Sequence, residues 1–231
     1  MKKIGLVGGL GPEATLDYYR RIIESVRERT GGPDAPEIVL YSANLEEALA
    51  LLEAKRPDLL AEWLLVKIEA LHAAGAEFAA ITANTAHLVF DEVDARSALP
   101  LISIVEATCE AAQRRGLKRV GLMGTRFTMQ ADFFQKPFLR HGLEVIVPTA
   151  ADQELIHEKL FSEIELGIIR DETREELLEV VRRMIERDGI DSLILGCTEP
   201  PLILPDTAHG IPFLNTTAIH VERIVAACLG R

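Results

Sequence analysis

Two matching stretches of sequence decide the fold: GAEFAAITANT at residues 75–85 and GIDSLILGCTE at residues 189–199. Each begins with glycine, passes an acidic residue, continues through apolar residues and ends in polar side chains. The second copy starts 114 residues after the first, since 189 − 75 = 114. The copies differ at one position that matters for chemistry, because Cys197 stands where the first copy has Ala83.

Two further segments repeat in the same order. KIGLVG at residues 3–8 matches RVGLMG at residues 119–124, and PLIS at residues 100–103 matches PFLN at residues 212–215. A repeat of this length is too long for a solenoid and fits a pair of similar α/β lobes. We therefore interpret the chain as a duplicated half.

The apolar patterns predict an α/β fold. Short continuous apolar runs alternate with amphipathic helical patterns, which is typical of parallel sheets covered on both faces. One helix is expected over Phe127–Leu139, and Thr173-x-x-Glu176 is interpreted as a capping box that opens another helix. The predicted architecture is two similar lobes, each a mainly parallel sheet flanked by helices. A pseudo-twofold duplication relates the lobes, and the active site is expected between them.

The duplication also predicts the lobe boundaries. Residues 1–99 together with 213–231 are expected to form the first lobe, and residues 100–212 the second. The segment at residues 212–214 is the counterpart of the crossing near residues 99–104. The final helix, Ile219–Leu229, is therefore expected to return to the first lobe.

Composition excludes several classes of function. The net charge of −11, from 25 basic and 36 acidic residues, argues against nucleic-acid binding. No apolar run reaches membrane-spanning length, and no signal peptide precedes the first expected strand. The three cysteines form neither a disulfide framework nor a metal motif. A cytoplasmic protein without a membrane partner is expected, with Cys109 and Cys228 as small buried helix residues.

Polar residues and tight turns follow the expected strands, where ligands of parallel α/β sheets bind. Hydroxyl, amide and backbone N–H groups at these strand ends would suit a substrate carboxylate, although some of the side chains could act only as helix caps. Glu199 could hold a substrate ammonium or cap a helix, and His87 is expected to be a satisfied supporting group. The predicted substrate-binding residues are Leu10, Gly11, Asn84, Thr85, Thr125, Thr198 and Glu199.

A pair of acid/base groups on opposite faces of a bound molecule could move a carbon-bound proton from one face to the other. A thiol suits this work, because its pKa of about 8.5 falls further at a helix N-terminus. Positions 83 and 197 are the two candidates for such a pair. Thr82 is a poor substitute for the missing group at Ala83, since adjacent strand residues point to opposite faces.

The chain resembles the aspartate/glutamate racemase family, the cofactor-independent group that includes aspartate, glutamate and hydantoin racemases. The resemblance rests on four motifs: GGLGPEAT at residues 8–15, ANTAH at 83–87, GTRFT at 124–128 and GCTE at 196–199. It implies that Cys197 is one of two acid/base residues in racemisation, without cofactor or metal. The family's second acid/base maps onto Ala83, which cannot transfer a proton.

Three explanations for Ala83 stay open: an engineered loss, a natural slow or inactive relative, or one-sided chemistry as in the related single-cysteine decarboxylases. A second departure from the family pattern concerns recognition of the substrate side chain. Several aspartate racemases carry basic residues in two regions, and these residues are missing here. The two regions read NLEEALALL at residues 44–52 and FSEIELG at residues 161–167.

Two other classes of function are compatible with parts of the sequence. Gly9-x-Gly11-x-x-Ala14 fits a nicotinamide fingerprint, but no acidic residue follows the second strand at Tyr41–Asn44. A catalytically inactive protein that binds a small carboxylate is the other alternative, and Ala83 favours it. The expected partner is a small amino acid, and a homodimer is the default assembly.

Overall fold

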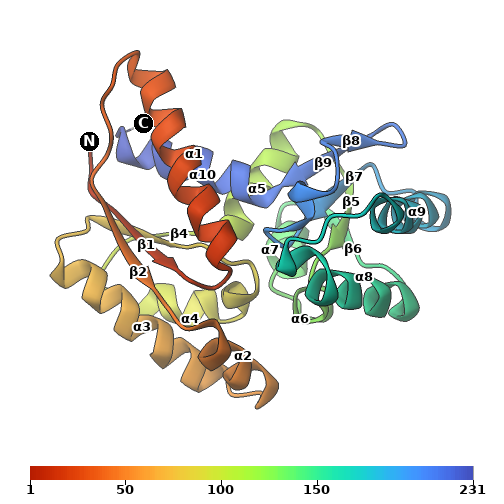
Figure 1. Cartoon of the computed structure of the whole chain (residues 1–231), viewed down its shortest axis with the longest axis horizontal. Coiled ribbons are helices and arrows are strands. Elements are labelled where there is room, and N and C mark those ends of the chain that lie inside the picture. The colour runs from red at the N-terminus through yellow and green to blue at the C-terminus, as the bar shows by residue number, and fades with distance from the viewer. Residues whose placement is uncertain (231) are drawn as a thin grey trace. The chain divides into compact units, whose positions relative to one another are not determined.

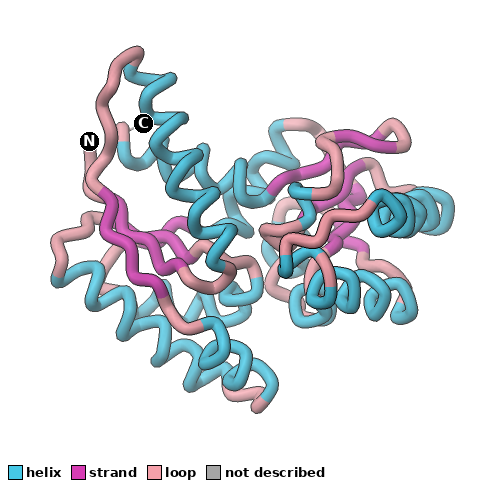
Figure 2. Tube along the Cα trace, viewed as in Figure 1, coloured by secondary structure: helices cyan, strands magenta, loops and turns pink. Residues whose placement is uncertain are grey.

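The chain divides into two compact units. The computed structural model describes residues 1–230. The first unit is Met1–Ala107 together with the chain from Thr217 onward, and the second is Thr108–Thr216. Helices separate nearly all successive strands (Figures 1 and 2). No helix within residues 1–230 is both long enough and apolar enough to cross a membrane.

The first unit is a four-stranded sheet in the order β2-β1-β3-β4, with every pairing parallel. Strands β1 and β3 are buried along their whole length, as their continuous apolar runs predict. The strands are β1 (Ile4–Gly8), β2 (Ile38–Ser42), β3 (Phe78–Ile81) and β4 (Leu101–Ile102).

Two apolar clusters cover the two faces of this sheet. Tyr18, Ile22 and Val26 of α1 pack with α10 residues on one face, and Leu60, Leu64 and Ile68 of α3 pack on the other. The helices are α1 (Pro12–Thr30), α2 (Leu45–Glu53), α3 (Pro57–Ala73), η1 (Thr85–Val89), α4 (Phe90–Arg96), α5 (Ile104–Arg114) and α10 (Thr216–Cys228). Cys109 and Cys228 are buried helix residues, which confirms that expectation.

The second unit repeats the same sheet order. Its strands run β6-β5-β7-β9-β8, and only the β8–β9 pairing is antiparallel. The strands are β5 (Arg119–Met123), β6 (Glu144–Ile146), β7 (Ser192–Leu195), β8 (Thr207–Ala208) and β9 (Ile211–Asn215). The helices are α6 (Arg126–Gln130), α7 (Gln135–Arg140), α8 (Ala150–Ser162), η2 (Ile164–Leu166), α9 (Asp171–Asp188) and η3 (Pro200–Leu202).

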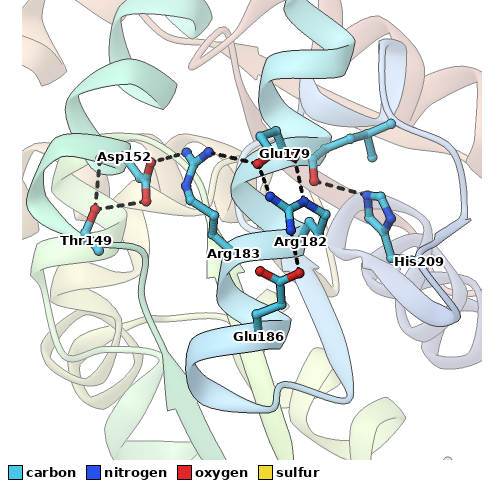
Figure 3. A network of polar contacts seen from close by, with 8 residues as sticks. Thr149, Asp152, Glu179, Arg182, Arg183, Glu186 and His209 are labelled. Carbon is cyan, nitrogen blue, oxygen red and sulfur yellow. Dashed lines mark hydrogen bonds and ion pairs between the residues drawn. The ribbon is translucent and has the colours of Figure 1, made fainter.

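A polar network ties α8 to α9 outside the apolar core of the second unit (Figure 3). The Arg183 guanidinium pairs with the Asp152 carboxylate, which also accepts a 2.9 Å hydrogen bond from the Thr149 hydroxyl. Arg183 lies 3.6 Å from Glu179, and Glu179 pairs with Arg182 at 2.5 Å. These contacts join the start of α8 to α9.

The predicted fold class is confirmed: each unit is a mainly parallel sheet flanked by helices, and the two sheets share one strand order. The chain passes from the first unit to the second partway along α5, and it returns to the first unit at the start of α10. The sequence analysis placed these boundaries after residues 99 and 212. Strand pairing accounts for the difference. β4 pairs with β3 and extends the first unit, and β9 pairs with β7 and extends the second.

Two local predictions were wrong. The helix expected over Phe127–Leu139 is interrupted, because Ala131 takes extended dihedral angles (φ −87°, ψ 165°) at the end of α6. The capping box at Thr173 does not form. Helix α9 begins at Asp171, and the Thr173 hydroxyl donates to the Glu163 carboxylate instead.

The turn after β1 brings two backbone segments into close contact. Gly9 has φ 79°, and a Cβ at this position would lie 2.2 Å from the Ala43 carbonyl oxygen. The Gly9 N–H donates to the Thr15 hydroxyl at 2.9 Å, and Ala43 N–H donates to the Gly8 carbonyl at 2.8 Å. Only glycine fits this turn without moving the neighbouring loop.

We predict that Gly9→Ala lowers the free energy of unfolding by about 3 kcal/mol, since it adds a backbone clash to an unfavourable left-handed conformation. Gly31→Ala is the matched control. Gly31 also has positive φ (69°), but a Cβ there would have no heavy atom within 4 Å. Its expected cost is about 1 kcal/mol. Urea denaturation of both variants measures the difference, and equal losses would contradict the clash.

Candidate active site

In the first unit, the predicted site residues follow β1 and β3 at the same edge of the sheet. These strands are parallel and in register, with Val7 opposite Ile81. Leu10, after β1, and Ala83, after β3, both pack against the same apolar cluster. The structure therefore groups Leu10 and Gly11 with the segment Ala83–Thr85.

Several polar groups at this edge serve the backbone. Thr82 is fully buried, and its hydroxyl donates to the Val7 carbonyl at 3.2 Å. Gly11 precedes α1 without a side-chain cap, and its carbonyl accepts from the Thr15 hydroxyl at 3.0 Å. Asn84 and Thr85 begin η1, and the Asn84 side chain makes no capping bond there. Capping therefore does not account for Asn84.

His87 links position 83 to the start of α5. Its Nε2 accepts from Ile104 N–H at 3.2 Å, which leaves Nδ1 to donate to the Ala83 carbonyl at 2.9 Å. Burial lowers the pKa of His87 to about 4, against a weaker opposite effect of the bond to Ala83. The expectation of a satisfied supporting group is confirmed.

A second buried imidazole lies nearby in the first unit. The ring centroids of His87 and His220 are 6.3 Å apart. His220 Nε2 donates to the Ile102 carbonyl at 2.9 Å, so its Nδ1 accepts the Tyr18 hydroxyl at 2.8 Å. Burial lowers the pKa of His220 to about 3, and the neighbouring His87 adds to this shift. Both rings are thus neutral at pH 7.

In the second unit, β5 and β7 bring two motifs to one edge. Met123 pairs with Leu195, and Gly196 N–H donates to the Met123 carbonyl at 2.6 Å. Thr125 follows β5 and caps α6 by accepting from Thr128 N–H at 3.3 Å. Thr125 therefore acts as a helix cap, which is one of the two roles expected for it from the sequence. Cys197 follows β7 at the same edge.

The Cys197 thiol lies beside a carboxylate. It is 8% exposed, and its Sγ donates to Glu199 Oε2 at 2.8 Å. The Thr198 hydroxyl donates to the other carboxylate oxygen, Oε1, also at 2.8 Å. Glu199 precedes η3 but makes no capping bond, so the capping alternative is wrong for this residue. The structure thus brings Cys197, Thr198 and Glu199 together.

The electrostatics of Cys197 differ from the sequence-based expectation of a lowered thiol pKa. Burial raises the pKa of Cys197 well above its usual value, and the negative charge of Glu199 and its hydrogen bond raise it further. Both effects favour the neutral thiol. Glu199 is placed to take the thiol proton whenever a thiolate forms.

Glu165 is a site residue that the sequence analysis missed. Its carboxylate lies with Cys197 Sγ and a Glu199 carboxylate oxygen in a group whose atoms are within 4.8 Å of one another. Burial raises the pKa of Glu165 to about 7, and the charge of Glu199 adds to the shift. The resemblance led us to expect a basic residue in the segment at residues 161–167, which has none. The acid that directly follows the buried Ile164 was the available signal.

The same three residues could hold a metal ion. One thiolate and two carboxylates are a donor set that Zn²⁺ accepts, with a fourth position left for water or substrate. Binding would require the Cys197 proton to leave, so affinity would fall at low pH.

The predicted site residues thus form two groups, one in each unit. Leu10, Gly11, Asn84 and Thr85 accompany Ala83 in the first unit. Thr198 and Glu199 accompany Cys197 in the second, and Thr125 follows the adjacent strand. The joint action of positions 83 and 197 on one substrate stays a prediction.

Comparisons with known proteins point to one family. The family model described as Asp/Glu/Hydantoin racemase matches residues 7–224. The broad specificity amino-acid racemase RacX of Bacillus subtilis is 25% identical over 232 residues, covering 98% of each chain. Crystal structures of a candidate Asp/Glu racemase from Yersinia pestis and of PH1733, an aspartate racemase homologue from Pyrococcus horikoshii, are also similar. Their identities are 34% and 36% and their TM-scores 0.91 and 0.84, over 99% of this chain and 100% of theirs.

We predict that Glu199→Gln raises the reactivity of Cys197 several-fold at pH 8. The substitution removes the charge that disfavours the thiolate and supplies an amide N–H that can donate to it. The rate of iodoacetamide modification at Cys197, followed by peptide mass spectrometry over a pH series, measures the effect. Glu158→Gln, on an exposed position of α8, is the control. An unchanged rate profile in Glu199→Gln would refute the electrostatic role of Glu199.

We also predict an acid-sensitive contribution of His87 to stability. Its pKa is depressed in the folded protein, so the stabilisation is complete above about pH 6.5 and falls as the pH drops towards about 4. Within this pH range, the contribution of a buried neutral histidine to the free energy of unfolding falls by about 1.4 kcal/mol for each unit by which the pH drops. Unfolding free energies at pH 7 and pH 5 should therefore differ less for His87→Gln than for the parent. Exposed His72→Gln should keep the parent's dependence.

Proposed function

Because the chain belongs to the Asp/Glu/hydantoin racemase family, we propose that it is an amino-acid isomerase in which Cys197 exchanges the α-hydrogen of its substrate. The observation that carries this proposal is the buried Cys197 thiol bonded to Glu199 at a strand end. Thr198 belongs to the same cluster, and Thr125 follows the adjacent strand. The family match over residues 7–224 supports the reaction class.

The chemistry follows from the hydrogen bond between thiol and carboxylate. Glu199 takes the proton from Sγ, and the resulting thiolate takes the α-proton of the amino acid, so that the sulfur is again a thiol. The electron pair left on the α-carbon delocalises into the substrate carboxylate. Return of a proton from Sγ to the same face regenerates the amino acid. If the thiol has exchanged its hydrogen with solvent before this return, the regenerated amino acid carries a hydrogen from solvent on its α-carbon.

Ala83 determines the stereochemical outcome of the proposed reaction. Racemisation needs a second acid/base on the opposite face, and the resemblance assigns that role to position 83. A methyl group cannot donate a proton. The chain should therefore exchange the α-hydrogen of one enantiomer with retention of configuration much faster than it racemises.

A protein that binds a small carboxylate without chemistry is the second candidate. Two features favour this candidate. Ala83 cannot transfer a proton, and the raised pKa of Cys197 lowers the amount of thiolate that could accept one. For the assembly and location we propose a cytoplasmic homodimer. The three cysteines, which are free and buried, and the prevalence of twofold symmetry among oligomers support this.

Deuterium exchange distinguishes these possibilities. A panel of L- and D-amino acids is incubated with the protein in deuterated water, and α-deuterium and configuration are followed by mass spectrometry and chiral chromatography. We expect deuterium in one enantiomer of a substrate without inversion. In Ala83→Cys and Ala83→Thr, racemisation should rise by about 10²–10⁴-fold. Cys197→Ala is the control and should exchange nothing.

Absence of exchange in the parent and in both Ala83 variants, across the panel, would reject the isomerase and leave the binding protein. Exchange that persists in Cys197→Ala would reject Cys197 as the acid/base.

A further inference from the structure

The charge around Cys197 in the second unit is negative. Glu165 and Glu199 lie within 4.8 Å of each other and of the thiol sulfur, measured between their ligand atoms. The charged groups that shift the pKa of Cys197 are these two carboxylates. A molecule that approaches the thiol therefore meets two acidic side chains of this unit.

Two basic residues near Glu165 in sequence, Lys159 and Arg174, are already paired, and the exposed Arg170 acts on Glu163. Lys159 contacts Glu163 at 3.3 Å and Glu176 at 2.9 Å. Arg174 pairs with Asp171 and donates to the Ile203 carbonyl at 3.1 Å. These ion pairs hold both cations to carboxylates other than Glu165 and Glu199. They cannot neutralise a second carboxylate of a substrate without giving up their present partners.

The segments that carry the two carboxylates are otherwise apolar at their surface. Leu166, directly after Glu165, is 68% exposed, and Leu202, three residues after Glu199, is 56% exposed. Leu202 N–H donates to the Glu199 backbone carbonyl at 2.8 Å, so η3 fixes the backbone of this leucine relative to that of Glu199. Apolar side chains and ammonium groups both suit such a surface.

We propose that Glu165 determines specificity by favouring amino acids with neutral or positively charged side chains over aspartate and glutamate. The inference rests on the proposed function of Cys197 and specifies the class of amino acid on which this residue would act. A neutral amino acid carries no net charge, whereas a dicarboxylic one carries a net negative charge into the field of Glu165 and Glu199. Like charges brought together in a partly buried site weaken binding strongly.

The test measures occupancy rather than turnover. Modification of Cys197 by methyl methanethiosulfonate at pH 8, where Glu165 is mostly ionised, is followed by peptide mass spectrometry in the presence of leucine, lysine, aspartate or glutamate. We expect leucine and lysine to protect Cys197 at concentrations on the order of tenfold lower than aspartate and glutamate. Glu165→Lys should reverse this order by replacing a negative charge with a positive one. Glu158→Lys makes the same charge change on an exposed position of α8 and should leave the order unchanged.

Equal or better protection by aspartate and glutamate in the parent would overturn the inference, and so would an unchanged order in Glu165→Lys or no protection by any amino acid. The proposed function is judged separately by deuterium exchange. If leucine protects but nothing exchanges, the site binds neutral amino acids without catalysis. If aspartate exchanges fastest and protects best, the isomerase stands and the role of Glu165 fails.

Discussion

Parallel pairing of short buried strands is the constraint on which the rest of the structure depends. β1 and β3 in the first unit, and β7 in the second, are buried over their full length. Parallel neighbours cannot be joined by a tight turn, so the connections between them carry helices and the parallel strands of a sheet end at the same edge. This geometry places Ala83 after β3 and Cys197 after β7, at the edge where parallel α/β sheets bind ligands.

The second unit keeps its thiol protonated. Burial and two acidic neighbours oppose the thiolate, so the reactive form of Cys197 exists only when a carboxylate has accepted its proton. Glu199 contacts the sulfur directly, and Glu165 adds a carboxyl group whose pKa is raised to about 7. A proton can therefore be held on the Cys197 sulfur or on the Glu165 carboxylate near neutral pH. Such sharing suits a reaction that must take a proton and give it back.

The sequence was sufficient for the parallel strands because apolar runs, glycine turns and the internal repeat all indicated them, but it did not predict the short antiparallel β8. One of its failures is local, and the others concern contacts between residues that are not neighbours in sequence. Thr173 bonds to Glu163 from another helix, and Ala131 leaves helical geometry within an apolar pattern. Glu165 reaches Cys197 across 32 positions of sequence, since 197 − 165 = 32. The acid after the apolar Ile164 is a local signal for Glu165, but it does not identify Cys197 as the contact.

The first unit is discontinuous in sequence, and this affects how it can assemble on the ribosome. Val221, Ile224 and Val225 of α10 belong to the same apolar cluster as Ile4 and Tyr18. During synthesis the amino-terminal segment must wait for the whole intervening unit before this cluster can close. The Tyr18 hydroxyl waits equally long for its His220 acceptor. A nascent chain can therefore complete the later unit while the earlier one still lacks part of its interior, which reverses the usual vectorial order.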